Sequence, residues 1–177
     1  MREELILDQK FDEVKSSNLG CSINEGFPYV GQIFTAGKTG SLAAVSVAIR
    51  SKRSMNPKQK FNFYKLKISI FNVENGFPKE ELVSVLLDRD ESSISEIIEL
   101  PTLIPQKEGD QFAILANYPD GTRHGAGQSL ATWSGLSDNK YPSGNLIFGT
   151  IDSWFISSLN NHDVFFRTYI LEQNCDK

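Results

Sequence analysis

The sequence predicts an all-β fold, an antiparallel β-sandwich made of two packed sheets. Apolar and polar residues alternate with a period of two along many short segments, as in strands with one buried face. Gly, Pro, Asn and Asp punctuate the chain between these segments, which is typical of sandwiches and barrels. A parallel sheet would need crossover helices, and helical periodicity is nearly absent.

Ten segments are expected to be strands, because each is short, rich in strand-forming residues and bounded by turn residues. In chain order they are Leu5–Phe11, Tyr29–Thr35, Leu42–Ile49, Lys65–Ile70, Leu82–Leu87, Ile97–Leu100, Gln111–Ala116, Leu130–Trp133, Asn145–Phe148 and Val164–Leu171. Lys65–Ile70 is the clearest, since apolar residues take every second place and lysine or serine fills the others. Leu42–Ile49 sets small residues opposite its valines, so both of its faces are expected to be covered.

One segment carries competing signals. Pro78, followed by lysine and two acids, resembles the N-terminus of a helix. Val83 and Val85, with Ser84 between them, favour a strand. The strand is the preferred prediction and the helix is the alternative.

Turn sequences separate the expected strands, and each contains residues that tolerate a positive φ or preset a turn. They are Gly37–Gly40, Asn75–Pro78, Glu108–Asp110, Pro119–Gly121 and Tyr141–Gly144. Gly37 and Gly40 are expected to release the chain into a tight turn between two strands.

Size and composition fit one globular domain. The chain has 177 residues, 40% hydrophobic and 23% charged, enough for a single core but thin for two. We expect one domain over residues 1–177, with its core at about 5–171. No window approaches the roughly 18 apolar residues of a membrane span, and Met1–Glu4 lacks the layout of a signal peptide. Membrane insertion is therefore not expected.

The charge balance argues against a nucleic-acid partner. With 18 basic and 22 acidic residues, the net charge of -4 repels a phosphate backbone. Basic residues gather within Arg50–Lys67, either to meet an anionic polymer or as a solvated loop and strand face. The two cysteines, Cys21 and Cys175, do not fit a zinc site. A sandwich whose first and last strands are neighbours would allow a disulfide between them, and the alternative is two unpaired thiols.

A family resemblance rests on short segments that occur in a characteristic order. They are Gly31–Gly37 with Gly40–Val45, Lys67–Ile70 with Asn75–Pro78, Pro105–Ile114, and Asp163–Tyr169. They resemble the bacterial jelly-roll domains of surface-anchored and secreted proteins, sometimes called choice-of-anchor domains, whose fold is similar to that of carbohydrate-binding modules. The resemblance implies jelly-roll topology and an extracellular or cell-surface location. Its motifs mark strands and turns, so it implies no catalytic residue, and the charged insert Lys52–Lys60 departs from it.

In the last segment, Arg167 is expected to face outward with Phe165 and Tyr169, opposite an inward set of Val164, Phe166 and Ile170. It either stacks on those rings or pairs with an acid such as Asp8.

No catalytic or metal-binding motif is found. His124 and His162 lie in polar turns with no fixed partner, and Gly125–Ser129 lacks the strand and helix that flank a nucleophile elbow. Asp88, Asp90 and Glu91 cluster without the Gly and terminal Glu of a calcium loop. Asp138 and Asp152 have no better claim as paired carboxylates for glycoside hydrolysis. We therefore expect no enzyme activity, cofactor or metal.

The region Asn117–Trp154 combines aromatic rings with amides, carboxylates and an arginine, the groups that recognise sugars. The candidate ligand-binding residues are Tyr118, Asp120, Arg123, Trp133 and Tyr141. Tyr118 and Tyr141 precede prolines and are expected to be the exposed rings. Trp133 and Trp154 also fit the core, where Trp154 would pack inside alongside Ile156.

Three functions remain from the sequence. The first is a non-catalytic module that binds a glycan or a cell-surface partner. The second is a structural or assembly domain of a larger surface, spore-coat or phage-derived particle, with the oligomeric state open. The third is a polysaccharide-active enzyme.

Overall fold

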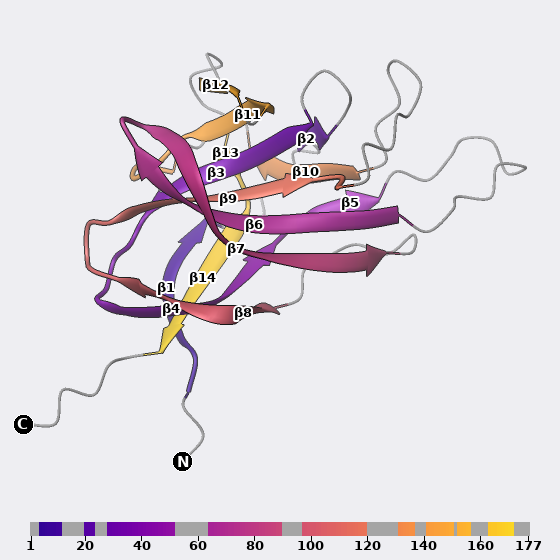
Figure 1. Ribbon diagram of the computed structural model, residues 1–177. Coiled ribbons are helices and arrows are strands. Elements are labelled where there is room, and N and C mark those ends of the chain that lie inside the picture. Colours follow the sequence, from indigo (N-terminus) through magenta and orange to yellow (C-terminus); the bar gives the residue numbers. More distant parts are fainter. Residues whose placement is uncertain are drawn as a thin grey trace, which may run out of the picture.

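The computed structural model describes residues 4–11, 20–23, 28–51, 64–89, 97–119, 131–136, 141–150, 152–156 and 163–171. Within these ranges the regular structure is entirely β, and the antiparallel sheets pack against each other as a β-sandwich (Figure 1). The predicted fold class is confirmed, while the jelly-roll topology stays a prediction. No helix in the described part of the chain is long and apolar enough to cross a membrane.

One layer is a six-stranded sheet. Its strands, in spatial order, are β12 (Ser153–Ile156), β11 (Leu146–Thr150), β3 (Tyr29–Thr35), β9 (Gln111–Asn117), β6 (Tyr64–Glu74) and β7 (Phe77–Arg89). The two longest, β6 and β7, form a hairpin closed by Asn75 and Gly76, whose φ values are 54° and 80°. Asn-Gly is the sequence that adopts two positive φ angles most readily, so it fixes this turn and the register beside it. The preferred strand prediction for Leu82–Leu87 is therefore confirmed over the helix.

The second layer contains β1 (Ile6–Phe11), β14 (Phe166–Leu171), β4 (Gly40–Val47) and β8 (Ile97–Gln106), in that spatial order. The first and last strands are neighbours, with Ile6 opposite Ile170. The turn Gly37–Gly40 carries the chain from the six-stranded sheet into this layer.

A short strand lies across the end of the β4–β14 pair. Beyond that pair the two strand segments separate. One continues as β5 (Ile49–Ser51) and the other begins as β13 (Asp163–Val164), and each pairs with a different half of β10 (Ala131–Leu136). The junction is held at Ser134, whose N–H donates to Ala48 O and whose carbonyl accepts from Phe165 N, both at 2.8 Å. The remaining strand, β2 (Gly20–Ile23), also pairs with β10.

The main core fills the space between the layers. Phe34 of the six-stranded sheet contacts Phe166 of the other layer with ring centroids 5.8 Å apart, and Phe112 at the same distance. Fully burying such a ring stabilises the fold by roughly 1.5–3 kcal/mol. Val164, Phe166 and Ile170 are buried and Arg167 is exposed, as predicted. Phe165 was expected to face outward with Arg167, but it packs against the main core, with its ring centroid 5.7 Å from that of Phe11.

Buried polar side chains also cross between the layers. Gln32 Nε2 donates to Asp163 Oδ1 at 2.7 Å, and Gln32 Oε1 accepts from Val164 N at 3.1 Å. The other carboxylate oxygen of Asp163 accepts from Tyr141 N at 2.8 Å. These directional contacts tie β3, β13 and the Tyr141 turn into one register, which apolar packing alone would leave less specified.

Two of the observed strands were not predicted, and others are longer than predicted. β2 and β12 have four residues each, too few for alternation to stand out. β8 continues through Pro101 and Pro105, which an edge strand tolerates because one of its sides needs no backbone donor.

Candidate functional site

Trp133, a predicted ligand-binding residue, lies in the core. It is fully buried, and its indole Nε1–H donates to Phe165 O at 2.8 Å. Because β10 lies across the end of the β4–β14 pair, its inward side chain closes that end of the core. The alternative placement of Trp133 in the core is confirmed, and this burial leaves no exposed indole ring for a ligand.

Tyr141 is buried as well, so its prediction as an exposed ring is wrong. Its side chain is 4% exposed, and its ring centroid lies 5.1 Å from that of Phe166 and 6.2 Å from that of Phe11. The hydroxyl donates to Gln9 Oε1 at 2.8 Å. Burial, with a smaller effect of the Asp8 and Asp163 carboxylates, raises the pKa of Tyr141 to about 12. A residue before proline suggested a surface turn, but the turn directs this ring into the core.

The remaining predicted residues do not form a shared platform in the described part of the chain. Tyr118 is half-buried and packs against the main core. Asp120 and Arg123 lie outside the described residues, as do His124 and His162.

The cysteines are likewise only partly described. Cys21 on β2 is a free thiol whose pKa is raised to about 11, first by burial and then by the nearby Asp163 carboxylate. A thiol with a raised pKa has little thiolate, so it is a poor nucleophile at neutral pH. Cys175 lies outside the described residues.

The six-stranded sheet carries a second apolar cluster on the face turned away from the main core. Its buried members are Ile33, Phe71, Ala113, Leu115 and Ile147. Tyr29, Val73 and Trp154 are half-buried and pack against them. The outward face of an antiparallel sheet is usually polar, so this apolar cluster sets the face apart.

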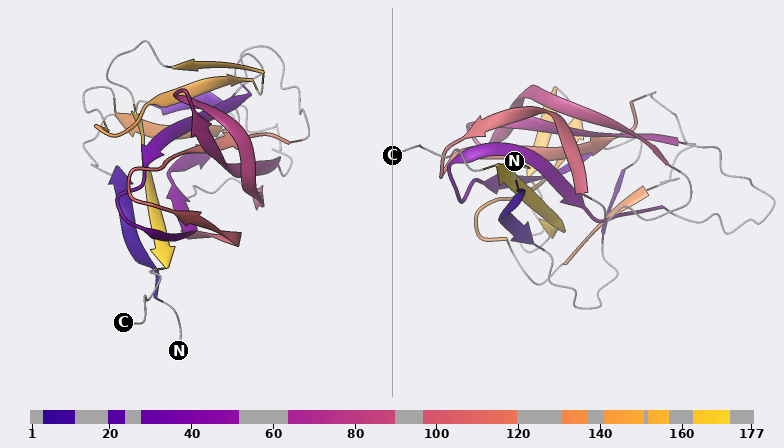
Figure 2. Two further views of the ribbon diagram at one scale, coloured as in Figure 1. Left: turned by 60° about the vertical axis from the view of Figure 1, so that its left-hand side comes forward. Right: turned by 90° about the horizontal axis from the view of Figure 1, so that it is seen from below.

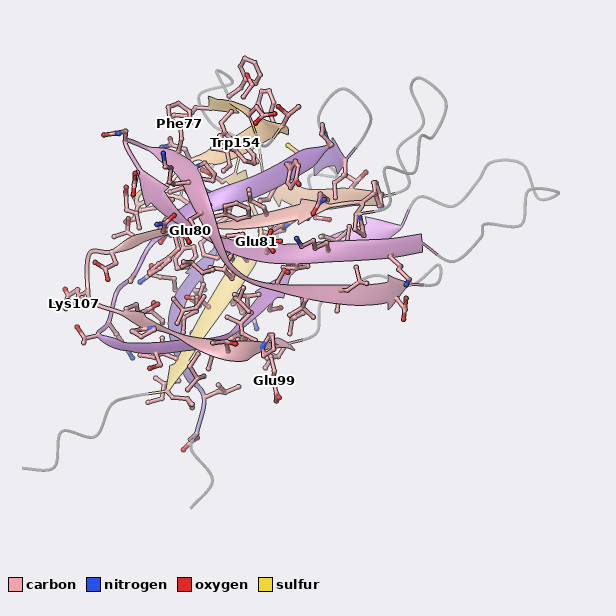
Figure 3. The ribbon with its side chains drawn as sticks, viewed as in Figure 1. Phe77, Glu80, Glu81, Glu99, Lys107 and Trp154 are labelled. Atoms are coloured by element: carbon pink, nitrogen blue, oxygen red, sulfur yellow. The ribbon has the colours of Figure 1, made fainter. Side chains whose placement is uncertain are left out.

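This face is cupped. Trp154 of β12 and Phe71 of β6 have ring centroids 6.5 Å apart, although β11, β3 and β9 lie between those strands in the sheet. In a flat sheet, strands four places apart are about 19 Å from each other. The sheet therefore curls toward this side, and Figure 2 shows the β6–β7 hairpin bending toward β11 and β12. In Figure 3, Phe77 and Trp154 lie at the same end of the molecule.

We call this surface the cupped face and define it by Tyr29, Ser69, Phe71, Asn117 and Trp154. The strand register places these residues on one side of the sheet: Asn117 lies opposite Tyr29, and Ser69 opposite Leu115. The Trp154 ring lies 5.6 Å from the Tyr29 ring at an interplanar angle of 72°. Two half-buried rings thus stand at an angle to each other beside polar side chains.

Two polar atoms of the cupped face are buried without a hydrogen-bond partner. They are Ser69 Oγ and Asn117 Oδ1, in side chains that are 0% and 6% exposed. A buried polar group without a partner costs about 1–3 kcal/mol. A molecule from outside the chain that bonded to these atoms would recover part of that cost.

An ion pair lies at the β6–β7 side of the same face. Lys67 Nζ is 2.8 Å from each carboxylate oxygen of Glu81, and both side chains are partly solvated. The two charges balance, so the pair adds no net charge to the face. Among the described residues, no three His, Cys, Asp or Glu side chains gather closely enough to hold a metal ion.

No protein-family model matches this sequence, and no curated protein matches it. The cupped face therefore has to be interpreted from its own geometry. Its arrangement of rings beside hydrogen-bonding groups suits binding of a ligand that has both an apolar face and hydroxyls.

The sequence held a signal for this face that the alternation pattern obscured. Tyr29–Thr35 and Gln111–Asn117 are apolar on both sides, which indicates central strands covered on both faces. Trp154 was expected inside beside Ile156, but it is half-buried on the cupped face and Ile156 is 41% exposed. Its position depends on the curvature of the sheet, which sequence does not state.

Proposed function

We propose that this domain is a non-catalytic binding module and that the cupped face recognises a carbohydrate. The observation that carries the proposal is the placement of two half-buried rings, Tyr29 and Trp154, on the same face as Ser69 Oγ and Asn117 Oδ1. Sugars present an apolar ring face and a rim of hydroxyls. An aromatic ring packs on the first, and buried polar atoms select the second.

The resemblance to choice-of-anchor jelly-roll domains supports the same proposal. Those domains belong to bacterial surface-anchored and secreted proteins and are similar in fold to carbohydrate-binding modules. A glycan or another cell-surface molecule is the class of ligand such a domain would meet outside the cell. We accordingly propose an extracellular or cell-surface location for this domain.

A glycan array followed by calorimetry on the best oligosaccharide tests the proposal. Trp154→Ala should weaken binding about tenfold or more, because it removes a stacking surface worth roughly 0.5–1.5 kcal/mol beyond its buried area. Phe155→Ala is the matched control, since Phe155 is adjacent on β12, is 50% exposed and stacks on Phe148 away from the cupped face. Equal losses in both variants, or no bound glycan at all, would refute the proposal.

A second candidate function, an assembly domain, is favoured by the edge of β7. Leu82 and Leu86 are 38% and 51% exposed on this strand, and the stretch Leu82–Leu87 contains neither a charge nor a proline. Such an edge offers unpaired backbone groups to another strand. A second copy pairing there would extend the six-stranded sheet. Light scattering at high concentration should then show a dimer that Leu86→Lys abolishes, and a monomer throughout would exclude it.

A further inference from the structure

The hydroxyl of Ser69 lies on the cupped face at its β6–β7 side, yet it has no access to solvent. Ser69 occupies the middle of β6, opposite Leu115 of β9 on one side and Ser84 of β7 on the other. Its side chain is fully buried, and Oγ has no partner. Whatever covers Ser69 controls whether that hydroxyl takes part in recognition.

The register places two charged side chains on either side of Ser69 along the strands. Lys67 precedes Ser69 by two positions on β6, and Glu81 lies on β7 opposite Phe71, two positions after Ser69. Lys67 and Glu81 therefore start from opposite sides of the Ser69–Ser84 row, about 13 Å apart along the strands. Because Lys67 Nζ lies 2.8 Å from the Glu81 carboxylate, the two side chains lean toward each other and meet above that row.

We infer that the Lys67–Glu81 ion pair is a lid over Ser69, and that a neutral polyhydroxylated ligand must part it to reach the Ser69 hydroxyl. This inference rests on the proposed function of the cupped face. To that function it adds the chemical class of the ligand and the ion pair that limits access of the ligand to Ser69. A neutral ligand is the class that fits, because an anion would be attracted by Lys67 and repelled by Glu81 at nearly the same place.

Opening the lid costs little. Both side chains are partly solvated, at 27% and 34% exposure, and exposed ion pairs contribute weakly to stability. The energetic gain of satisfying a buried hydroxyl outweighs the loss of such a pair. The lid therefore moderates affinity without abolishing binding.

The test measures oligosaccharide affinity with cellohexaose, xylohexaose and mannohexaose, for the wild type and for Glu81→Gln, Ser69→Ala and the double variant. Glu81→Gln keeps the shape of the side chain but removes its charge, so the affinity should rise by up to about fivefold. Ser69→Ala should weaken binding and should cancel the gain in the double variant. Wild-type affinity should rise with salt between low and physiological ionic strength, because salt screens the pair, and that of Glu81→Gln should not.

The outcomes separate the two proposals. If the wild type binds a hexaose but Glu81→Gln and Ser69→Ala both leave affinity and its salt dependence unchanged, the lid is refuted and the binding function stands. If no variant binds any of the three probes, the lid and the carbohydrate function are both refuted. A single cooperative thermal melt for each variant shows that it is folded.

Discussion

At the scale of single residues, the sequence predicted the side of the strand on which a side chain lies better than it predicted the role of that side chain. Val164, Phe166, Ile170 and Arg167 point as the alternation indicated, because period two alone decides which side of a strand a residue occupies. The role of Tyr141 could not be predicted in this way. Its burial depends on Phe11, Phe166 and Gln9, which come from distant strands.

Ser69 gives the sharpest prediction at this scale. Ser69→Ala removes a buried hydroxyl that has no partner, so the free energy of unfolding should rise by about 1 kcal/mol. Urea denaturation measures this change. The matched control is Ser84→Ala, directly opposite on β7 and only half-buried, which should change stability by less than about 0.5 kcal/mol. A destabilised Ser69→Ala would show that the hydroxyl is satisfied within the fold.

The raised pKa of Tyr141 leads us to predict how the free energy of unfolding falls at alkaline pH. Its pKa is about 12 in the fold against an ordinary value of 10, so the folded state favours the protonated phenol. The corresponding stabilisation is complete below pH 10 and is lost as pH rises toward 12, amounting to something on the order of 2 kcal/mol. Chemical denaturation across this range should show the loss for the wild type. In Tyr141→Phe the decline should be smaller, while stability at pH 7 falls by about 1 kcal/mol because the bond to Gln9 is gone.

At the scale of elements, local signals decided what the sequence could predict. Asn75–Gly76 predicted the turn of the β6–β7 hairpin, because this turn needs two positive φ angles and Asn-Gly adopts them readily. Tyr29–Thr35 was predicted with the observed bounds, since its apolar run lies between clear breakers. β2 and β12 were not predicted, because a four-residue strand is stabilised mainly by the neighbour with which it pairs. That neighbour is β10 for β2 and β11 for β12.

The hairpin turn supplies a paired prediction. Gly76→Ala should destabilise the fold by about 1 kcal/mol, because a side chain is strained at a φ of 80°. Asn75→Gly, at a φ of 54°, should change stability little, since glycine adopts this conformation without strain. Thermal unfolding of the two variants is the measurement. Equal changes in stability for the two variants would mean that the turn relaxes and does not hold the register of the β6–β7 hairpin.

At the scale of the whole molecule, the fold class followed from the pattern of short alternating segments, and the site did not. Two sheets with a shared core are the economical way to bury one face of each strand. The cupped face arises only when the six-stranded sheet curls far enough to bring Trp154 of β12 to Phe71 of β6. Curvature is a collective property of many strands, so no single stretch of sequence encodes it.

The two tryptophans offer the most direct test of the claim that the cupped face binds the ligand. The chain contains only Trp133 and Trp154, so its indole N–H groups give two resonances in a ¹H–¹⁵N spectrum. Trp133 is buried and bonded to Phe165, whereas Trp154 lies half-buried on the cupped face. Titration with a bound oligosaccharide should shift the Trp154 indole signal and leave that of Trp133 in place. A titration in which binding occurs but the Trp154 signal does not move would contradict the account.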